Sequence, residues 1–328
     1  MKNVNAPIFI IGMPRSGTKL LRSLLVNHDD IFIPSIETEC LPSWTSKYSK
    51  VNFSDKGEFS QFYDEVTKSI YFSHQHRHGK QIIDKSIWFE RSKGGDISKV
   101  FEELIKHDTA WTEGKIWGDK SPSYINHVTT IRQCFPNARI ILIVRDVRDY
   151  CLSINKAWGK NIYRAAQRWY DSHKKVLPQV SALGHEGLTI KYEDLTQDPQ
   201  KQLEKICNFI GIEFNSKLLS VTNSTENLGS AKGATTILSD NQSKWKKLLT
   251  SNEIYKIESY SWPILEEFQY EITREFNKVS KISMVKTYYY KLADGYNLLM
   301  TNREKGILWN LRVYLRNMID RINIKQKK

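Results

Sequence analysis

The sequence predicts an α/β fold, in which a central parallel sheet is flanked by helices. Short apolar runs alternate along the chain with segments of helical periodicity, which is the pattern of parallel strands joined by helices. Residues 139–144 form an unbroken, β-branched run, as expected of a strand that is buried on both faces. With 328 residues, 40% of them hydrophobic, the chain is long enough for one large domain with an appendage.

Five segments are predicted to be the strands of this sheet. Each is a short apolar run that ends at polar or turn-forming residues. In chain order they are residues 8–13, 31–33, 116–120, 139–144 and 188–192. In an open parallel sheet, ligands collect at the carboxyl ends of the strands, so we expect the functional site at that edge.

The predicted helices lie between and after these strands. Pro122 and Pro199 suit the first turn of a helix, and Gly211 suits a helix end. The expected helices cover residues 18–27, 122–135, 147–180 with a break near Gly159, 199–210, and a helical region that starts at residue 251.

Residues 40–115 are expected to be an insertion that covers the site. They contain aromatic-rich helical segments, at 59–72 and 97–106, among polar loops. We therefore expect residues 1–270 to form the main domain, and residues 271–328 to form a basic, helical C-terminal extension.

Cysteines and histidines do not predict a metal site. The four cysteines are far apart and include no Cys-x-x-Cys pair, which favours reduced thiols over a disulfide framework or zinc. His74, His76 and His78 have a spacing that suits a metal, but their polar and basic neighbours favour a solvated loop.

The most informative segment is Gly-Met-Pro-Arg-Ser-Gly-Thr at residues 12–18, between the first strand and its helix. Such a loop directs backbone N–H groups and the positive end of a helix dipole at an anion. The two glycines have the Walker A spacing, but Thr18 precedes Lys19, so the lysine and the Mg²⁺-binding hydroxyl are out of register. Arg15 lies inside the loop instead.

A second anion-binding signal follows the buried strand, in Val-Arg-Asp-Val-Arg-Asp-Tyr-Cys-Leu-Ser at residues 144–153. Arg145 comes at the carboxyl end of the strand, and Ser153 lies two turns into the next helix. A guanidinium fork with a nearby hydroxyl suits a phosphate. Two such sites predict a ligand with two separated anionic groups. Between Arg145 and Ser153 in the sequence, Arg148 and Asp149 are expected to be a surface pair.

These two motifs together resemble the sulfotransferases that use 3′-phosphoadenosine 5′-phosphosulfate (PAPS). The loop arginine is closer to the branch with tyrosylprotein sulfotransferases and many bacterial members than to cytosolic sulfotransferases, whose loop carries a lysine. The resemblance covers residues 6–250 and implies the α/β sulfotransferase fold, which is similar to that of P-loop NTPases.

The resemblance implies a role for each matching residue. The 5′-phosphosulfate loop would comprise Arg15, Ser16, Gly17, Thr18 and Lys19. The 3′-phosphate would be held by Arg145 and Ser153, and the nucleotide would also be contacted by Tyr192 and Lys244. The family's loop usually reads Ser-Gly-Thr-Thr, so Lys19 stands where a threonine hydroxyl would bind.

Three residues are implied to be catalytic. Arg15 and Lys120 would stabilise charge on the transferred and leaving groups without a metal. Glu37 matches the family's catalytic carboxylate and would accept the acceptor's proton. From the residues alone, Glu39, His28 and Asp29 stay open as alternative bases.

The charge distribution points to a polyanionic partner. Of the formal net charge of +13, +9 lies in residues 274–328, which carry 13 basic and 4 acidic side chains. Within them, Leu308, Leu311, Leu315, Met318, Ile319 and Ile322 recur at helical spacing. This amphipathic basic helix either docks on the body or contacts a membrane or partner.

No pattern in the sequence identifies the acceptor. The absence of a signal peptide or a long apolar run favours a cytoplasmic protein, which the basic tail could bring to a membrane surface. Together with the aromatic-rich insertion and the basic tail, this location leads us to expect a hydroxyl of a carbohydrate or glycolipid. Sulfation of a protein tyrosine and a P-loop small-molecule kinase are the alternatives. Nucleic-acid binding is not favoured, and the oligomeric state stays open.

Overall fold

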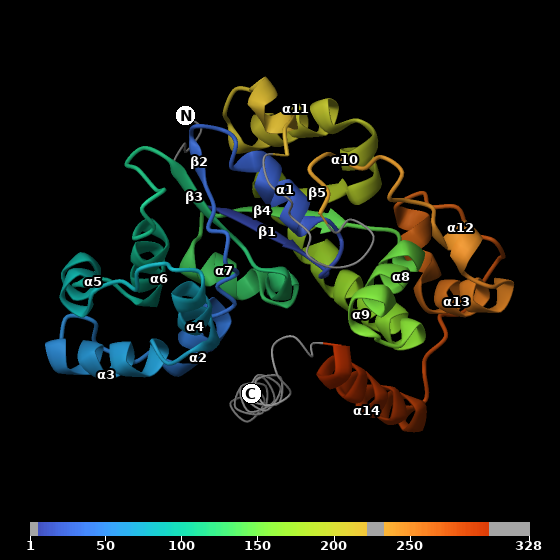
Figure 1. Cartoon of the computed structure of the whole chain (residues 1–328), viewed down its shortest axis with the longest axis horizontal. Helices are drawn as coiled ribbons and strands as arrows, with labels where there is room; N and C mark the ends of the chain where they lie inside the picture. Colours follow the sequence, from blue (N-terminus) through green and yellow to red (C-terminus); the bar gives the residue numbers. More distant parts are fainter. Residues whose placement is uncertain (1–5, 222–232, 302–328) are drawn as a thin grey trace.

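Five parallel strands form the centre of the computed structural model, which describes residues 6–221 and 233–301. The sheet order is β2-β3-β1-β4-β5, and every neighbouring pair is parallel. The strands are β1 (Ile8–Gly12), β2 (Ile31–Phe32), β3 (Ile116–Lys120), β4 (Arg139–Val144) and β5 (Gly187–Lys191). The predicted α/β class is confirmed, and Figure 1 shows helices on both faces of the sheet.

Alternate residues of the central strands enter two separate apolar clusters, because successive side chains of a strand point to opposite faces. Ile8 and Ile10 of β1 pack with side chains of α1 (Thr18–Leu25) and α11 (Pro199–Ile210). Phe9 and Ile11 belong to the other and larger cluster. Both faces of β1 are therefore buried, which fixes the loop that follows it.

Four helices lie beside the carboxyl ends of β4 and β5. They are α8 (Val147–Trp158), α9 (Ile162–Ser181), α12 (Trp245–Leu248) and α13 (Ser251–Glu267). The predicted break near Gly159 is confirmed: Gly159 caps α8 with a φ of 62°. The predicted strand 188–192 ends one residue early, because Tyr192 is the first residue of α10 (Tyr192–Gln197).

The insertion is more helical than predicted. The polar loops expected between two helical segments are replaced by five helices, namely α2 (Leu41–Lys47), α3 (Lys56–Val66), α4 (Ile70–Arg77), α5 (Lys85–Ser92) and α6 (Ile97–Lys106). The segment predicted at 59–72 is divided between α3 and α4, while α6 has the predicted bounds. His74 and His76 lie on α4 rather than in a loop.

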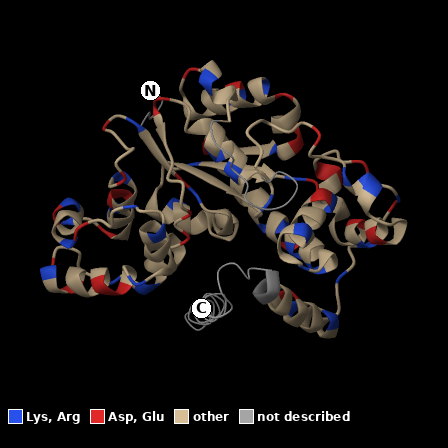
Figure 2. Ribbon diagram, in the orientation of Figure 1, with Lys and Arg blue, Asp and Glu red and all other residues tan. Residues whose placement is uncertain are grey.

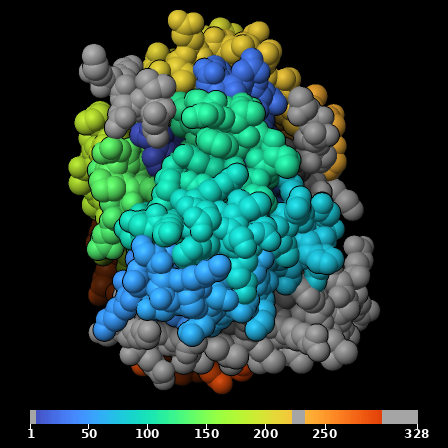
Figure 3. All heavy atoms as spheres, turned by 90° about the vertical axis from the view of Figure 1, so that its left-hand side faces the viewer, coloured from blue at the N-terminus to red at the C-terminus, as the bar shows by residue number. Residues whose placement is uncertain are grey.

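Aromatic side chains hold these helices together. Trp88 of α5 is fully buried and its ring lies 5.5 Å from that of Phe62 of α3 and 6.1 Å from that of Trp44 of α2. Figure 3 shows the result from the outside, a continuous lobe of residues from the N-terminal third of the chain. These side chains belong to the same apolar cluster as Phe9 of β1 and Trp117 of β3, so the insertion packs directly against this side of the sheet and shares its core.

The helix predicted at 122–135 is interrupted. A 3₁₀ turn covers Pro122–Asn126, and α7 covers Val128–Cys134. His127 between them has a φ of −135°, outside the helical range. The interruption lets Tyr124 point inward, where its hydroxyl contacts the Thr38 hydroxyl at 2.8 Å and accepts from the Leu41 N–H at 3.0 Å.

The C-terminal extension begins with α14 (Met284–Thr301), which lies against the end of α8. The amphipathic helix predicted around residues 308–322 lies outside the described residues. Over the body, basic and acidic side chains are interspersed rather than separated (Figure 2). Among the helices in the described part of the chain, none combines the length and apolar character needed to cross a bilayer.

Candidate active site

The loop between β1 and α1 has a strained conformation. Arg15 has a φ of 71° and Gly17 a φ of 95°. A non-glycine residue in this left-handed region is rare and is typical of functional loops. Glycine is required at position 17 for a second reason: an added Cβ atom would lie 2.4 Å from Cδ2 of Tyr192. The sequence thus folds this loop tightly against the first residue of α10.

Two buried polar groups at this loop have no partner in the described structure. The hydroxyl of Ser16, a fully buried residue, makes no hydrogen bond, and neither does Nε of Arg145. Leaving such groups unpaired costs about 1–3 kcal/mol each. Both lie near the start of α1, where the helix dipole also favours an anion. The arrangement therefore suits a bound anionic group that would accept these hydrogen bonds.

Arg145 is held rigidly by its neighbours. One terminal nitrogen donates to the Arg15 carbonyl at 3.0 Å, and the other donates to the Asn241 carbonyl at 2.8 Å. Its guanidinium carbon lies 4.4 Å from the centre of the Tyr192 ring. Arg15 in turn donates from Nε to the Ser153 hydroxyl at 3.3 Å. Both predicted anion-binding motifs thus meet at one place.

Asn241 joins this group and was not predicted. Its amide donates to the Tyr192 hydroxyl at 2.9 Å, and its amide oxygen accepts from Lys244 Nζ at 2.9 Å. It is buried. Asn241 lies in a loop-rich segment without a motif. The sequence could have pointed to it only through its position three residues before the predicted Lys244.

A cavity of about 190 Å³ opens beside these side chains. Six of the nine predicted cofactor-binding residues line it, together with Asn241; the six are Arg15, Gly17, Arg145, Ser153, Tyr192 and Lys244. Ser16 and Thr18 are buried next to it, while Lys19 is exposed. The structure therefore brings the predicted residues together and leaves the Lys19 side chain outside the cavity wall.

Arg148 and Asp149 are not the surface pair that was predicted. Arg148 is 1% exposed and Asp149 is 3% exposed. Rather than pairing with Arg148, Asp149 accepts from the Trp245 backbone N–H at 3.0 Å. Charged residues at adjacent positions of a helix do not face each other, so their sequence proximity was misleading.

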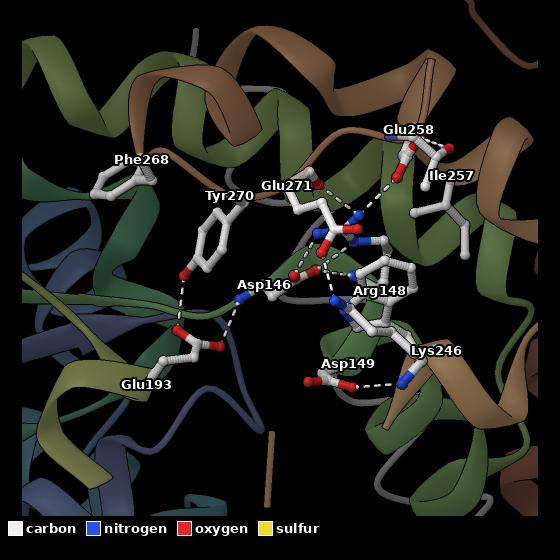
Figure 4. A network of polar contacts seen from close by, with 12 residues as sticks. Asp146, Arg148, Asp149, Glu193, Lys246, Ile257, Glu258, Phe268, Tyr270 and Glu271 are labelled. Carbon is white, nitrogen blue, oxygen red and sulfur yellow. Dashed lines mark hydrogen bonds and ion pairs between the residues drawn. The ribbon is translucent and has the colours of Figure 1, made fainter. Parts of the chain in front are cut away.

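Arg148 is the centre of a buried ionic network, shown in Figure 4. It makes a bidentate contact with Asp146, at 3.0 Å from Nε and 2.7 Å from a terminal nitrogen. Its other terminal nitrogen donates to Glu258 of α13 at 2.6 Å and to the Glu271 carbonyl at 2.7 Å. The guanidinium carbon lies 3.7 Å from the centre of a Trp245 ring. Arg148 thus ties α8, α12 and α13 together.

A second branch of the network connects to α10. Glu193 accepts from the Asp146 N–H at 3.0 Å and from the Tyr270 hydroxyl at 2.7 Å. Burial raises the pKa of Glu193, although the hydrogen bond from Tyr270 opposes this. Asp146 and Glu193 directly follow Arg145 and Tyr192, which line the cavity. Their hydrogen bonds therefore help to hold the cavity wall in place.

The predicted catalytic pair lies at the ends of β2 and β3. Lys120 Nζ and the Glu37 carboxylate form a hydrogen-bonded ion pair. The Lys120 side chain is 1% exposed and that of Glu37 is 31% exposed. Burial lowers the pKa of Lys120, and the nearby negative charge of Glu37 opposes the shift. The positive charge of Lys19 also lowers the pKa of Lys120, to a smaller extent.

Asp119 is a buried carboxylate that the sequence did not single out. It is 1% exposed, and neither oxygen has a hydrogen bond of good geometry in the described structure. Burial raises its pKa to about 6, while the Ser121 and Thr38 hydroxyls and the Lys120 charge act in the opposite direction. It lies next to the catalytic pair in sequence but is closed off from solvent.

The alternative bases are less suited to proton transfer. Both ring nitrogens of His28 are engaged, one with the Glu213 carbonyl at 3.0 Å and the other with the Asp30 N–H at 3.1 Å. Asp29 pairs with Lys217 at 2.8 Å. Glu39 is exposed, with a φ of 51° that directs its backbone N–H to Ser121. Glu37 differs from these residues in that its charged partner is the buried Lys120, and its role as the base stays a prediction.

Comparisons with known proteins agree with this geometry. Residues 7–216 match the family model of the sulfotransferase family. A putative protein-tyrosine sulfotransferase of Caenorhabditis briggsae is 23% identical over 67% of this chain and 70% of its own length. Protein-tyrosine sulfotransferase 1 of Danio rerio is 24% identical over 65% of this chain and 55% of its own length. The chain thus spans little more than half the length of some relatives that it matches.

Solved structures show the same fold. The sulfotransferase domain from the curacin biosynthetic pathway matches with a TM-score of 0.54 and 22% identity, over 81% of this chain and 98% of that one. The sulfotransferase domain of the Synechococcus PCC 7002 olefin synthase gives a TM-score of 0.54 and 24% identity, over 83% and 97%.

Proposed function

The chain belongs to the sulfotransferase family, whose members take the sulfuryl group from PAPS, and from this premise we propose that it sulfates a hydroxyl of a carbohydrate or glycolipid. The observation that carries the acceptor proposal is a second hollow, beside Ile36, the residue before Glu37, with several amide and hydroxyl side chains on its mixed wall.

The residues of the first cavity fit the donor. The unpaired Ser16 hydroxyl and the start of α1 suit the 5′-phosphosulfate, and Arg145 with Ser153 suits the 3′-phosphate. The Tyr192 ring and Lys244 line the same cavity and suit the rest of the nucleotide. When bound, PAPS supplies a sulfuryl group on a phosphate leaving group.

The chain's own residues would then carry out the transfer. Glu37 would take the proton of the acceptor hydroxyl, and the sulfuryl group supplied by PAPS would pass to the oxygen of that hydroxyl, with adenosine 3′,5′-bisphosphate as the leaving group. Lys120 and Arg15 stabilise the negative charge that develops on the sulfuryl and phosphate oxygens. Because Lys120 is buried, its charge acts with little screening by water.

The second hollow supports a carbohydrate acceptor. It is lined by Ile36, directly before Glu37, and by side chains of α4, α6 and the turns that follow these helices. Amide and hydroxyl groups are common on its wall, including Ser35, Gln75, Gln81 and Thr109. The buried Gln75 amide oxygen has no partner in the described structure. Such mixed donors and acceptors suit a ligand with several hydroxyl groups.

Protein tyrosine is the second candidate acceptor. It is favoured by the relatives named above, which are protein-tyrosine sulfotransferases or putative ones. The formal net charge of +13 would also attract acidic peptide segments. The small-molecule kinase alternative has no comparable support, since Lys19 lies outside the cavity wall. The predicted cytoplasmic location and the domain boundary stay predictions.

The donor is tested by calorimetric titration with adenosine 3′,5′-bisphosphate and, in parallel, with ATP and Mg²⁺. We expect the bisphosphate to bind at least tenfold more tightly, because Arg145 and Ser153 address a 3′-phosphate that ATP lacks. Equal or tighter binding of ATP would contradict the donor assignment and revive the kinase alternative.

The acceptor is tested with radiolabelled PAPS and a panel of oligosaccharides, glycolipids and tyrosine-containing acidic peptides. We expect label on the sugars. Gln75→Leu should then raise KM for the sugar, while Ser73→Ala on the same helix serves as the matched control. Label on the peptides alone would replace the carbohydrate proposal by tyrosine sulfation while leaving the transfer chemistry intact.

A further inference from the structure

The exposed face of α14 is the most apolar surface in the described structure. The exposed hydrophobic side chains on this one helix, between 58% and 89% accessible, are Met284, Val285, Tyr288, Tyr289, Leu292 and Tyr296. Elsewhere in residues 6–221 and 233–301, only Ile87, Leu248 and Tyr255 are large, hydrophobic and exposed. A concentration of this kind marks an interaction or membrane surface.

The opposite face of α14 is fixed to the body. Asp294 is 6% exposed, accepts from the Asn161 N–H at 2.7 Å and forms an ion pair with Arg164. One turn later, the Asn297 amide donates to the Gly159 carbonyl at 2.7 Å. Since these polar contacts hold the helix at the junction of α8 and α9, they determine which face points outward.

The outward face has the layout of an interfacial helix. At about 100° per residue, its six apolar side chains fall within an arc of about 140°. Lys286 and Lys291 border this arc on its two sides, and both are exposed. The only acidic residue of the helix, Asp294, is on the body side. Tyrosine suits the boundary between lipid and water, and bordering lysines reach phosphate headgroups.

We propose that α14 binds the protein peripherally to an anionic lipid surface, with the tyrosine-rich face inserted at headgroup level. The charge supports this occupant over another protein surface, because residues 274–328 carry +9 of the net charge, and basic segments near a membrane are attracted to acidic lipids. The proposal does not depend on the acceptor, since lipid binding is measured without turnover.

The test is co-sedimentation of the full chain with vesicles of phosphatidylcholine alone and of phosphatidylcholine mixed with phosphatidylglycerol. We expect binding to the mixed vesicles and little to the neutral ones. The triple variant Tyr288→Ser, Leu292→Ser, Tyr296→Ser should bind the mixed vesicles about tenfold more weakly or worse, since its apolar area is lost.

The matched control replaces the other exposed hydrophobics, Ile87→Ser, Leu248→Ser and Tyr255→Ser, and should bind as the parent chain does. A charge pair, Lys286→Glu with Lys291→Glu, should abolish the preference for phosphatidylglycerol, whereas Lys50→Glu with Lys68→Glu should not. Circular dichroism and melting temperatures establish that each variant is folded.

Two results would overturn the proposal. One is equal vesicle binding by the parent and the triple α14 variant, which would assign lipid contact to other basic residues. The other is no vesicle binding together with a dimer, seen by light scattering, that the triple variant abolishes. That result would make the face a contact between two copies of the chain.

Discussion

The two sides of the sheet hold their functional side chains in different ways. At the ends of β4 and β5, Arg145 is fixed by direct hydrogen bonds and backed by the buried network around Arg148. At the ends of β2 and β3, Lys120 and Glu37 have each other as their charged partner, and the inserted helices pack against the same side of the sheet by aromatic contacts. One side is organised by charge and the other by apolar packing.

This difference matches what each side would recognise under the proposed function. A nucleotide with fixed phosphates is best met by a rigid, prearranged set of donors. An acceptor hydroxyl must approach Glu37 and then leave, so a more accessible carboxylate is required there. The ionic side should therefore control stability and donor affinity, and the aromatic side should control turnover. The predictions below test this division.

The largest effect is expected from Glu37→Gln. The amide is close to isosteric but cannot accept the proton, so turnover should fall by about 10²- to 10⁴-fold. The affinity for adenosine 3′,5′-bisphosphate should be unchanged, because Glu37 does not line the nucleotide cavity. Steady-state kinetics and calorimetry measure the two quantities. Glu39→Gln is the matched control, and a larger loss there would move the base to Glu39.

Arg148→Met should act on stability. It leaves Asp146 and Glu258 buried without their cation, and breaking a buried pair in this way costs about 3–5 kcal/mol. Arg132→Met is the control, because its ion pair with Glu186 is about one quarter exposed and such partly exposed pairs contribute about 1 kcal/mol or less. Urea unfolding measures both. Similar losses in the two variants would show that the network is not what makes this side rigid.

Arg145→Ala should weaken donor binding. Loss of a charge-assisted contact to the 3′-phosphate costs about 1.5–3 kcal/mol, or about 10- to 100-fold in Kd for adenosine 3′,5′-bisphosphate. The control is Arg139→Ala at the other end of β4, where the side chain bonds the Ile210 carbonyl. That variant should lose stability and keep its affinity. Unchanged affinity in Arg145→Ala would place the 3′-phosphate elsewhere.

On the ionic side, the sequence predicted the motif residues but missed the residues that hold them in place. Arg15, Arg145 and Ser153 lie in short motifs whose residue types and spacing reflect one ligand, so local sequence carries the information. Asn241 was missed because its contact with Arg145 joins two segments that are 96 residues apart in the sequence. Hydrogen bonds between distant segments leave no local pattern.

The error at Arg148 and Asp149 has the same origin. Adjacent opposite charges on a helix usually face solvent, and only the packing of α12 and α13 over α8 shows that they are buried. In the insertion, periodicity identified α6, merged α3 with the start of α4, and missed the short α2 and α5. Their helices depend on mutual aromatic packing more than on intrinsic propensity.

The last effect concerns Asp119 of β3, next to Lys120 in sequence. Burial raises its pKa to about 6, so the folded state favours the protonated carboxyl. The group therefore stabilises the fold at low pH relative to neutral pH, and stability is lost as the pH rises from the ordinary value of about 4 towards 6. The full shift corresponds to at most about 3 kcal/mol.

Asp119→Asn removes this titration. Relative to the parent chain, the variant should gain stability at pH 7, and the gain should shrink as the pH falls below 5, as measured by urea unfolding across the range. Asp64→Asn on the surface should leave the profile unchanged. If Asp119→Asn were instead destabilised, with a loss that is largest at pH 7 and shrinks as the pH falls towards 4, the carboxylate would be acting as an ionised support for Lys120, and the side of the sheet at β2 and β3 would also depend on a buried charge.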